Sequence, residues 1–366
     1  MTSAWSIPGP PPRDELADQS DARLSGATLS APPAMAGPAH PGAFELVDGR
    51  GVYVRRVDGP PDGVPAWYVH GLAGSSTNWT RLAAVLGAVS PGYLVDLPGA
   101  GRSDPPPGGR YSLRADAALV SELIGDLTGG PVHLLGNSLG GIVATALAAR
   151  FPHRVRSLTL ISPAVPDLRL QRDRGADPRL AVVMVPGTGP VASRRLAAID
   201  AMQRAKGMGE LCFGEPDSLT DQDYAAAASD LAWRGALPWA HTATVSSLRA
   251  LIRTYLRAGK SSFRSAAASI SVPTLVVWGT RDRLVDARLA RPTADAFPDG
   301  RLLMVAGSGH VAQMEHPALV ADAVLALWQD AGDPVARAVD SGDRAATTGA
   351  GAPLRNERPT VGTSKP

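Results

Sequence analysis

The chain is poor in cysteine and in long apolar runs, and both shortages narrow the class of protein. Cys212 is the single cysteine among 366 residues, so no internal disulfide can form and a reducing compartment is permitted. No apolar run reaches the roughly 18 residues of a membrane-spanning helix. The beginning of the chain lacks the positive start and the unbroken apolar core of a signal peptide. We therefore predict a soluble, cytoplasmic protein with no transmembrane segment.

An excess of charge of one sign is also missing. The 36 basic and 34 acidic residues give a net charge of +2, and the basic residues do not form one run, so nucleic-acid binding is not predicted. The sequence contains no Cys/His cluster with metal-ligand spacing and no phosphate-binding loop. We therefore predict neither a metal ion nor an organic cofactor.

A serine between glycines is the most informative feature that is present. Residues 136–140 have the pattern G-x-S-x-G, with Ser138 at its centre. The short apolar run before it predicts a buried strand, and the apolar residues after it recur at helical spacing as far as Arg150. Ser138 is thus predicted to lie on a strand-turn-helix corner. Such a corner projects the hydroxyl toward a base while nearby backbone N–H groups stabilise an oxyanion, as a serine nucleophile requires.

An aspartate and a histidine follow this serine in the order that a nucleophile, an orienting acid and a base can take along a chain. Asp282 comes directly after a strongly apolar segment, where its carboxylate can be buried against a base. His310 ends a glycine-rich loop. His316 and Asp286 compete for these roles, but His316 precedes a proline at the expected start of a helix, and Asp286 lies further from the apolar segment. The hypothesis is that His310 is the base and Asp282 the acid.

Two further turns make the pattern more specific. Residues 67–69 predict a strand that ends in a His-Gly turn, and residues 96–103 have the pattern D-x-x-G-x-G-x-S. In this order the five motifs resemble those of the α/β-hydrolase superfamily, in particular its capped serine hydrolases of the esterase and C–C hydrolase-like group. The resemblance extends over about residues 44–330.

This resemblance implies a fold and a set of functional residues. The fold is an α/β fold, with a mainly parallel sheet flanked by helices and a helical cap inserted between the sixth strand and the acid-bearing strand. The implied catalytic triad is Ser138, Asp282 and His310. The implied oxyanion hole consists of the backbone N–H groups of Leu72 and Leu139.

Three other polar residues are given structural roles. The turn that begins at Asp96 is a structural signature in the superfamily, so Asp96 is not expected to be catalytic. His70 and His133 precede the serine, and the chain order of the superfamily excludes them as the base, although His70 is expected near the pocket. His133 alternates with apolar strand neighbours and is predicted to be a core histidine whose hydrogen bonds are satisfied.

Composition and periodicity divide the chain into core and tails. Residues 1–42 and 333–366 are crowded with Pro, Gly, Ser and Ala and lack sustained periodicity, so we predict two disordered tails. Strand and helix signals alternate over residues 43–163, beginning with a hairpin over residues 44–57, and they return over residues 269–332. These two stretches are the predicted α/β core.

The alternation stops between the two halves of the core. Residues 164–268 are rich in Ala, Leu and Arg and show helical spacing, which predicts a helical cap or lid. Residues 166–265 carry 14 basic and 10 acidic residues, a net charge of +4. This small excess favours an anionic substrate or contact with an anionic membrane surface.

The implied triad predicts the chemistry: acyl transfer to water in two steps, in a carboxylesterase or lipase-like enzyme acting on a mainly hydrophobic small-molecule ester. Haloalkane dehalogenase-like and epoxide hydrolase-like relatives use an aspartate at the elbow, so Ser138 argues against both. A meta-cleavage-type C–C hydrolase remains an alternative, although those relatives usually carry Trp after the base, where this chain has Val311. The same residues are also compatible with a cofactor-free perhydrolase and with a non-catalytic ligand-binding scaffold.

Overall fold

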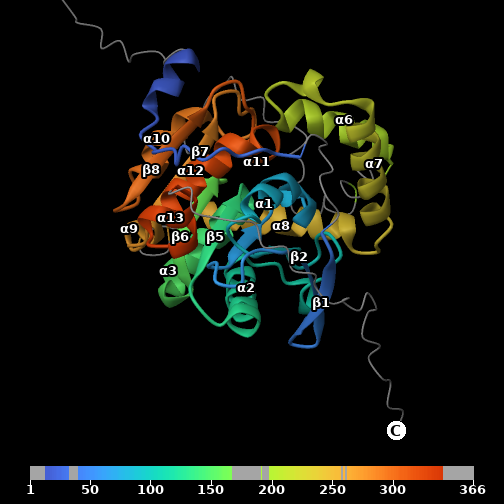
Figure 1. Cartoon of the computed structure of the whole chain (residues 1–366). Helices are drawn as coiled ribbons and strands as arrows, with labels where there is room; N and C mark the ends of the chain where they lie inside the picture. The colour runs from blue at the N-terminus through green and yellow to red at the C-terminus, as the bar shows by residue number, and fades with distance from the viewer. Residues whose placement is uncertain are drawn as a thin grey trace, which may run out of the picture.

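An eight-stranded sheet organises the part of the chain that the structure describes (Figure 1). The structure is a computed structural model, and it describes residues 13–32, 40–166, 198–256 and 262–340, with residues 191 and 259 as isolated positions. The strands are β1 (Gly42–Val47), β2 (Arg50–Val57), β3 (Ala66–Val69), β4 (Gly92–Val95), β5 (Val132–Asn137), β6 (Val155–Ile161), β7 (Thr274–Gly279) and β8 (Gly300–Val305).

The strands have the order β1-β2-β4-β3-β5-β6-β7-β8. β1 and β2 form an antiparallel hairpin, and β2 is also antiparallel to β4. The remaining neighbours in the sheet are parallel. The predicted opening hairpin and mainly parallel sheet are therefore confirmed.

Helices cover both faces of the sheet. They are α1 (Thr80–Leu86), α2 (Leu113–Thr128), α3 (Leu139–Arg150), α6 (Ala201–Cys212), α7 (Asp221–Gly235), α8 (Ala240–Tyr255), α9 (Phe263–Ala268), α10 (Ala290–Ala294), α11 (Ala312–Glu315), α12 (Pro317–Asp330) and α13 (Pro334–Asp340). Leu134 of β5 packs into the apolar cluster shared with α2 and α3, whereas Leu135 packs into the cluster shared with α1 and α12. Because both faces are buried, apolar side chains occupy consecutive positions of β5 at Leu134 and Leu135.

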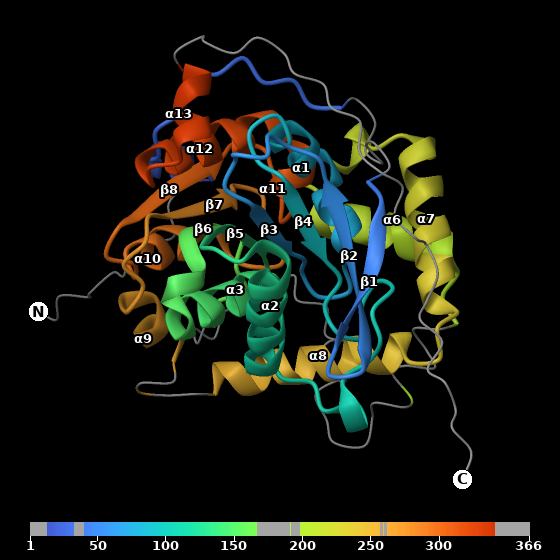
Figure 2. The same cartoon turned by 60° about the horizontal axis from the view of Figure 1, so that its bottom comes forward.

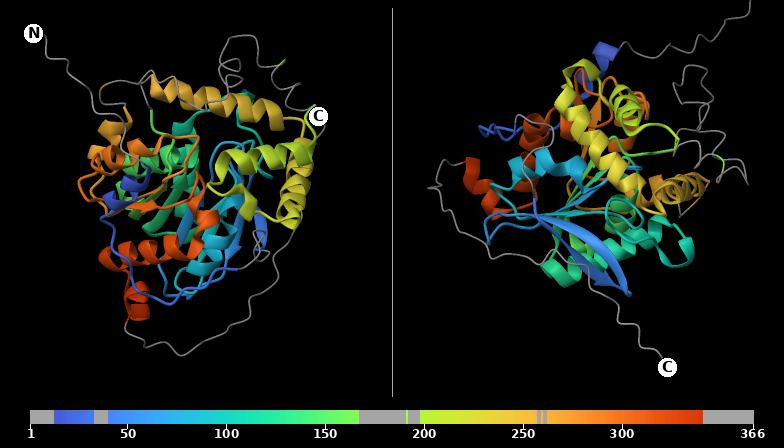
Figure 3. Two further views of the ribbon diagram at one scale, coloured as in Figure 1. Left: turned by 90° about the horizontal axis from the view of Figure 1, so that it is seen from above. Right: turned by 90° about the vertical axis from the view of Figure 1, so that its right-hand side faces the viewer.

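A helical insertion follows β6, as predicted. Helices α6 to α9 lie between β6 and β7 in the chain. Figures 2 and 3 show α6 and α7 side by side, whereas α8 extends away from them past α2. The Asp200 side chain begins α6 by accepting two backbone N–H bonds, and Thr220 begins α7 with a capping box. Residues 167–190, 192–197, 257–258 and 260–261 of the expected cap lie outside the described residues. Within the described ranges, every helix is too short or too polar to cross a bilayer.

The prediction of a disordered tail over residues 1–42 is wrong for residues 13–32. A 3-10 helix, η1, spans Arg13–Gln19, and the chain then runs along β8. The backbone N–H of Asp21 donates to the Leu302 carbonyl at 2.9 Å, and the Asp21 carboxylate accepts from the Leu302 N–H at 2.6 Å. Composition did not reveal this packing, because it depends on a partner that lies about 280 residues away along the chain.

The prediction of a second disordered tail over residues 333–366 is wrong at its beginning. The last described helix, α13, packs against α12, and Val335 and Ala336 are 1% and 0% exposed. The Asp333 carboxylate accepts from the N–H groups of both residues, which fixes the first turn of α13. Residues 1–12, 33–39 and 341–366 of the two expected tails lie outside the described residues, whereas Gly42, the last residue of the first expected tail, already belongs to β1.

His133 is a buried core residue with satisfied hydrogen bonds, as predicted. Its Nδ1 lies 2.7 Å from the Ser157 hydroxyl and its Nε2 lies 3.0 Å from the Asp333 carboxylate, while its ring stacks on Trp328. Burial lowers the pKa of His133, so the neutral ring donates from Nε2 and accepts from Ser157 at Nδ1. Burial alone raises the pKa of Asp333, but the hydrogen bonds from His133 and from α13 outweigh it and hold that pKa below its usual value.

We expect Asp333→Ala to lower the free energy of unfolding at pH 7 by about 1–3 kcal/mol, because it leaves a buried imidazole N–H unpaired. Asp333→Asn should cost less, since its amide oxygen still accepts. Because the pKa of Asp333 is lower in the folded than in the unfolded chain, its ionised carboxylate stabilises the fold at pH values above 3.8, the unfolded pKa. This stabilisation is lost as the pH falls through the lower pKa of the folded state. Urea unfolding at pH 7 and at pH 3 measures both effects. Equal stability of wild type and Asp333→Ala at pH 7 would contradict this account.

Candidate active site

Ser138 lies on a strained turn between β5 and α3. Its backbone has φ 54° and ψ −119°, a conformation that residues with a side chain rarely adopt. The Ser138 N–H donates to the Ile161 carbonyl at 3.0 Å, and its carbonyl accepts from Gly141 at 2.9 Å and Ala164 at 3.0 Å. These bonds hold the turn through its backbone. The Ser138 side chain makes no capping bond to α3, so its hydroxyl is not used to begin that helix.

Glycines make this turn possible because the chain approaches itself closely. A Cβ on Gly136 would lie 2.5 Å from the Gly140 carbonyl oxygen, and a Cβ on Gly140 would lie 2.2 Å from the Val69 carbonyl oxygen. Both contacts are too short for any side chain. The glycines of the sequence pattern therefore let α3 begin directly against the end of β3.

His310 and Asp282 contact each other at the carboxyl end of the sheet. His310 Nδ1 lies 2.9 Å from Asp282 Oδ2, and the two side chains are 5% and 0% exposed. The other carboxylate oxygen, Oδ1, accepts from the N–H groups of Leu284 and Val285 at 2.9 and 3.0 Å. An acceptor at Nδ1 favours the proton on that nitrogen and leaves Nε2 of the neutral ring as an acceptor. The Asp282 carboxylate is thus fixed by its own turn and orients the imidazole.

The loop that carries His310 is tied to the turn that carries Ser138. Asn137, the residue before Ser138, donates from Nδ2 to the His310 carbonyl at 3.2 Å and to the Ile161 carbonyl at 3.0 Å. A Cβ on Gly71 would lie 3.1 Å from the Ser138 Cβ, so the turn after β3 meets the serine as well. The structure therefore brings the predicted nucleophile, base and oxyanion turn to one edge of the sheet.

The competing candidates lie apart from this contact. His316 is exposed at the N-cap position, directly before α12, and its side chain makes no capping bond. Asp286 begins the short helix η7 (Ala287–Leu289), where its carboxylate binds the backbone N–H and the guanidinium of Arg288. The Asp96 carboxylate accepts from the N–H groups of Ser76 at 2.6 Å and Arg102 at 2.8 Å, so it holds two turns together.

His70 orients the peptide that carries one predicted oxyanion donor. Its Nδ1 lies 2.7 Å from the Gly71 carbonyl oxygen, and its Nε2 accepts from the Leu97 N–H at 3.0 Å. Burial lowers the pKa of His70, which keeps the ring neutral. Because Nε2 accepts a hydrogen bond, Nδ1 carries the proton and donates to the Gly71 carbonyl oxygen. That carbonyl and the Leu72 N–H belong to the same peptide group. The sequence placed His70 near the pocket and did not predict this positioning role.

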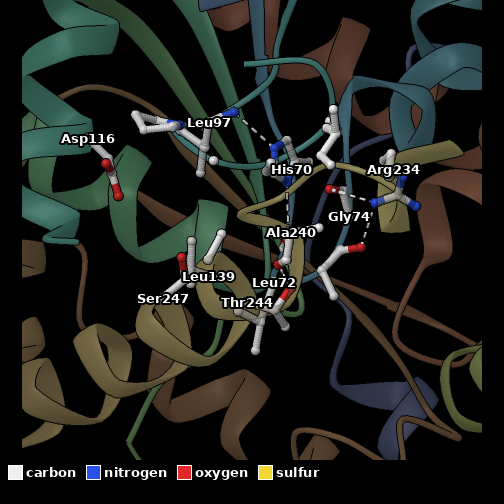
Figure 4. A pocket seen from close by; sticks show the side chains of 18 residues that line it. His70, Leu72, Gly74, Leu97, Asp116, Leu139, Arg234, Ala240, Thr244 and Ser247 are labelled. Atoms are coloured by element: carbon white, nitrogen blue, oxygen red, sulfur yellow. Dashed lines mark hydrogen bonds between the residues drawn. The ribbon is translucent and has the colours of Figure 1, made fainter. Parts of the chain in front are cut away.

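A cavity of about 60 Å³ lies beside the two predicted oxyanion residues (Figure 4). Leu72 and Leu139 line it from the core, and α8 supplies Thr244 and Ser247 from the helical insertion. Arg234 of α7 also lines it and donates to the carbonyl oxygens of residues 73 and 74 at 3.0 and 3.3 Å. The insertion thus contacts the loop next to Leu72. Among the described residues, no group of three or more His, Cys, Asp or Glu side chains is arranged to hold a metal ion.

The sequence match agrees with this architecture. A family model described as the alpha/beta hydrolase fold matches residues 68–317, a segment that runs from β3 through the loop of His310. The chain belongs to the α/β-hydrolase family. The resemblance carried by the five motifs and the predicted fold class are confirmed by this match.

Relatives within the α/β-hydrolase family include different activities. A 2-hydroxy-6-oxononadienedioate/2-hydroxy-6-oxononatrienedioate hydrolase from Cupriavidus pinatubonensis is 29% identical over 253 residues, covering 68% of this chain and 81% of that protein. Lipase 3 of a Moraxella species is 24% identical over 257 residues, covering 69% and 73%. The structure of a thermophilic esterase from Thermogutta terrifontis superposes with a TM-score of 0.61 at 20% identity, covering 80% of this chain and 99% of that one. These similarities support a hydrolase of this fold. Because the relatives carry different activities, they do not specify which bond is cleaved.

Proposed function

We propose that the protein hydrolyses a carboxylic ester of a mainly hydrophobic small molecule through an acyl-enzyme on Ser138. The contact between His310 and Asp282, beside a serine held on a strained turn, is the observation that carries this proposal. These residues occupy the roles of base, acid and nucleophile in a serine triad. The non-catalytic scaffold explains neither the strain at Ser138 nor the buried imidazole-carboxylate pair.

The proposed reaction has two acyl-transfer steps. In the first, the Ser138 oxygen attacks the ester carbonyl while His310 Nε2 takes the hydroxyl proton, and the N–H groups of Leu72 and Leu139 stabilise the oxyanion. The C–O bond to the alcohol then breaks, and His310 returns the proton to the leaving oxygen. In the second step, His310 takes a proton from water as the water oxygen attacks the acyl carbon. The bond between that carbon and the Ser138 oxygen then breaks, His310 returns the proton to the Ser138 oxygen, and the carboxylic acid is released. Asp282 supports the imidazolium in both steps without taking its proton.

We further infer that the helical insertion over residues 164–268 acts as a lid that limits which substrates enter. Thr244, Ser247 and Arg234 of this segment line the same cavity as Leu72 and Leu139. Ligands of open α/β sheets bind at the carboxyl ends of the strands, which is where this insertion lies in the chain. The lid therefore sets substrate shape, whereas the residues around Ser138 set the reaction type.

The proposal is tested by measuring turnover of p-nitrophenyl esters with acyl chains from acetyl to palmitoyl, alongside a meta-cleavage dienone. We expect ester hydrolysis with a maximum at one chain length, because a lid bounds the pocket, and we expect labelling of Ser138 by a fluorophosphonate. Turnover of the dienone without ester hydrolysis would instead support C–C cleavage. A folded protein that neither turns over a substrate nor is labelled would contradict catalysis. Ester hydrolysis with no dependence on chain length would contradict the lid.

A further inference from the structure

The cavity beside Leu72 and Leu139 contains one acidic side chain among its described lining residues, that of Asp116 (Figure 4). This residue lies in the first turn of α2 and belongs to neither the proposed triad nor the oxyanion hole. Figure 4 shows it on the side of the cavity away from Arg234. It is therefore placed to contact the part of a substrate that extends beyond the reacting carbonyl.

The Asp116 carboxyl is buried and lacks a partner within the described part of the protein. Asp116 is 8% exposed, and its backbone N–H donates to the Ser112 carbonyl, but no hydrogen bond or ion pair from a described residue reaches its carboxylate. Burial raises the pKa of Asp116 to about 7, although the charge of Arg50 acts in the opposite direction. The carboxyl oxygens are not completely shielded, so they are open to a group that enters the cavity, and an acid so nearly buried without a partner is unusual.

We propose that Asp116 determines specificity by binding a neutral hydroxyl group of the substrate. This inference rests on the proposed ester hydrolysis and narrows its substrate to hydroxylated esters. The substrate hydroxyl would supply the partner that the carboxyl lacks, and two further polar residues, Thr244 and Ser247, belong to the same lining. A site built around such a bond discriminates strongly against an analogue without the hydroxyl, because the buried carboxyl is then left unpaired.

A hydroxyl suits this carboxyl better than a charged group does. It can donate to the carboxylate and accept from the protonated acid, so it binds in both states of Asp116. An ammonium group requires the ionised form, which burial disfavours, and Arg50 already supplies positive charge nearby. A carboxylate on the substrate would be repelled by the ionised form. The neutral hydroxyl is the chemistry that fits the site across neutral pH.

The test compares two pairs of esters that differ only in hydroxyl groups. On the acyl side the pair is p-nitrophenyl butyrate and p-nitrophenyl 3-hydroxybutyrate, and on the alcohol side it is propyl butyrate and 2,3-dihydroxypropyl butyrate. The wild-type chain should prefer the hydroxylated member of at least one pair by about tenfold or more in kcat/KM. Asp116→Leu, which keeps the branched shape of the side chain, should reduce that ratio to about one or below.

The control is Glu122→Gln, which removes an exposed carboxyl from the same helix and should leave the ratio unchanged. A purely structural role of Asp116 would lower kcat/KM for both members of a pair and leave their ratio intact, which would overturn the inference. No preference for either hydroxylated ester in the wild-type chain would also overturn it, whether or not Asp116→Leu folds. If none of the esters is hydrolysed and Ser138 is not labelled, the proposed function itself fails, and this inference fails with it.

Discussion

Ser138→Ala is expected to reduce kcat for the preferred ester by a factor on the order of 10⁴ or more, because it removes the proposed nucleophile. Fluorophosphonate labelling should disappear as well. The fold should persist, since the turn is held by the backbone bonds to Ile161, Gly141 and Ala164, which alanine retains. Steady-state kinetics, labelling and circular dichroism on the same preparation measure these three outcomes.

Ser162 offers a matched control for that substitution. It is a second serine with a positive φ, 42°, and it follows β6, the strand next to β5. Its hydroxyl is buried and has no hydrogen-bond partner in the described structure. Ser162→Ala should therefore keep kcat within a few-fold of wild type. Near-normal activity of Ser138→Ala, or an equal loss in Ser162→Ala, would show that Ser138 is not the nucleophile.

His310→Ala should reduce kcat about as much as Ser138→Ala does, because without a base at Nε2 the serine hydroxyl cannot be activated. Asp282→Asn should be milder by about tenfold to 100-fold, since the acid orients and supports the base but takes no part in bond making. Combining either change with Ser138→Ala should cost little more, because residues that act as a unit are not additive.

Steady-state kinetics on His316→Ala provide the control for the base. His316 is exposed, so its replacement should leave kcat unchanged. The assignment would move to His316 if His310→Ala kept full activity and His316→Ala lost it. A loss for Asp286→Asn that exceeds the loss for Asp282→Asn would likewise reassign the acid.

The turn at Ser138 could be predicted from the sequence because its causes are local. Glycine is required at positions 136 and 140 because a Cβ there would lie 2.5 and 2.2 Å from a backbone carbonyl oxygen. The first oxygen belongs to the turn itself, and the second lies at the end of the adjacent strand, β3. The strand before the turn, β5, is buried on both faces, and its consecutive apolar residues are visible in the sequence. The order of serine, acid and base along the chain then follows from the motifs.

The features that the sequence did not reveal depend on partners far away in the chain. His133 and Asp333 are 200 residues apart, and this bond explains why the chain after α12 remains packed. Asp116, by contrast, does have a local signal: it lies three residues after Leu113 and four before Val120, on the apolar face of α2. An acid on such a face is unusual, and its position alone is enough to make it a candidate.

The N-terminal segment also determines how the sheet ends. The outer N–H groups of β8 at Leu302 and Met304 are bonded by the Asp21 carboxylate and the Ser20 hydroxyl, and the Leu302 carbonyl accepts from Asp21 and Ala22. An exposed edge strand is a template on which a strand of another molecule can add, which leads to aggregation. With these positions occupied, such addition to β8 requires residues 20–22 to detach first. A short segment of irregular backbone thus protects the molecule against association through this edge, a role independent of the reaction at Ser138.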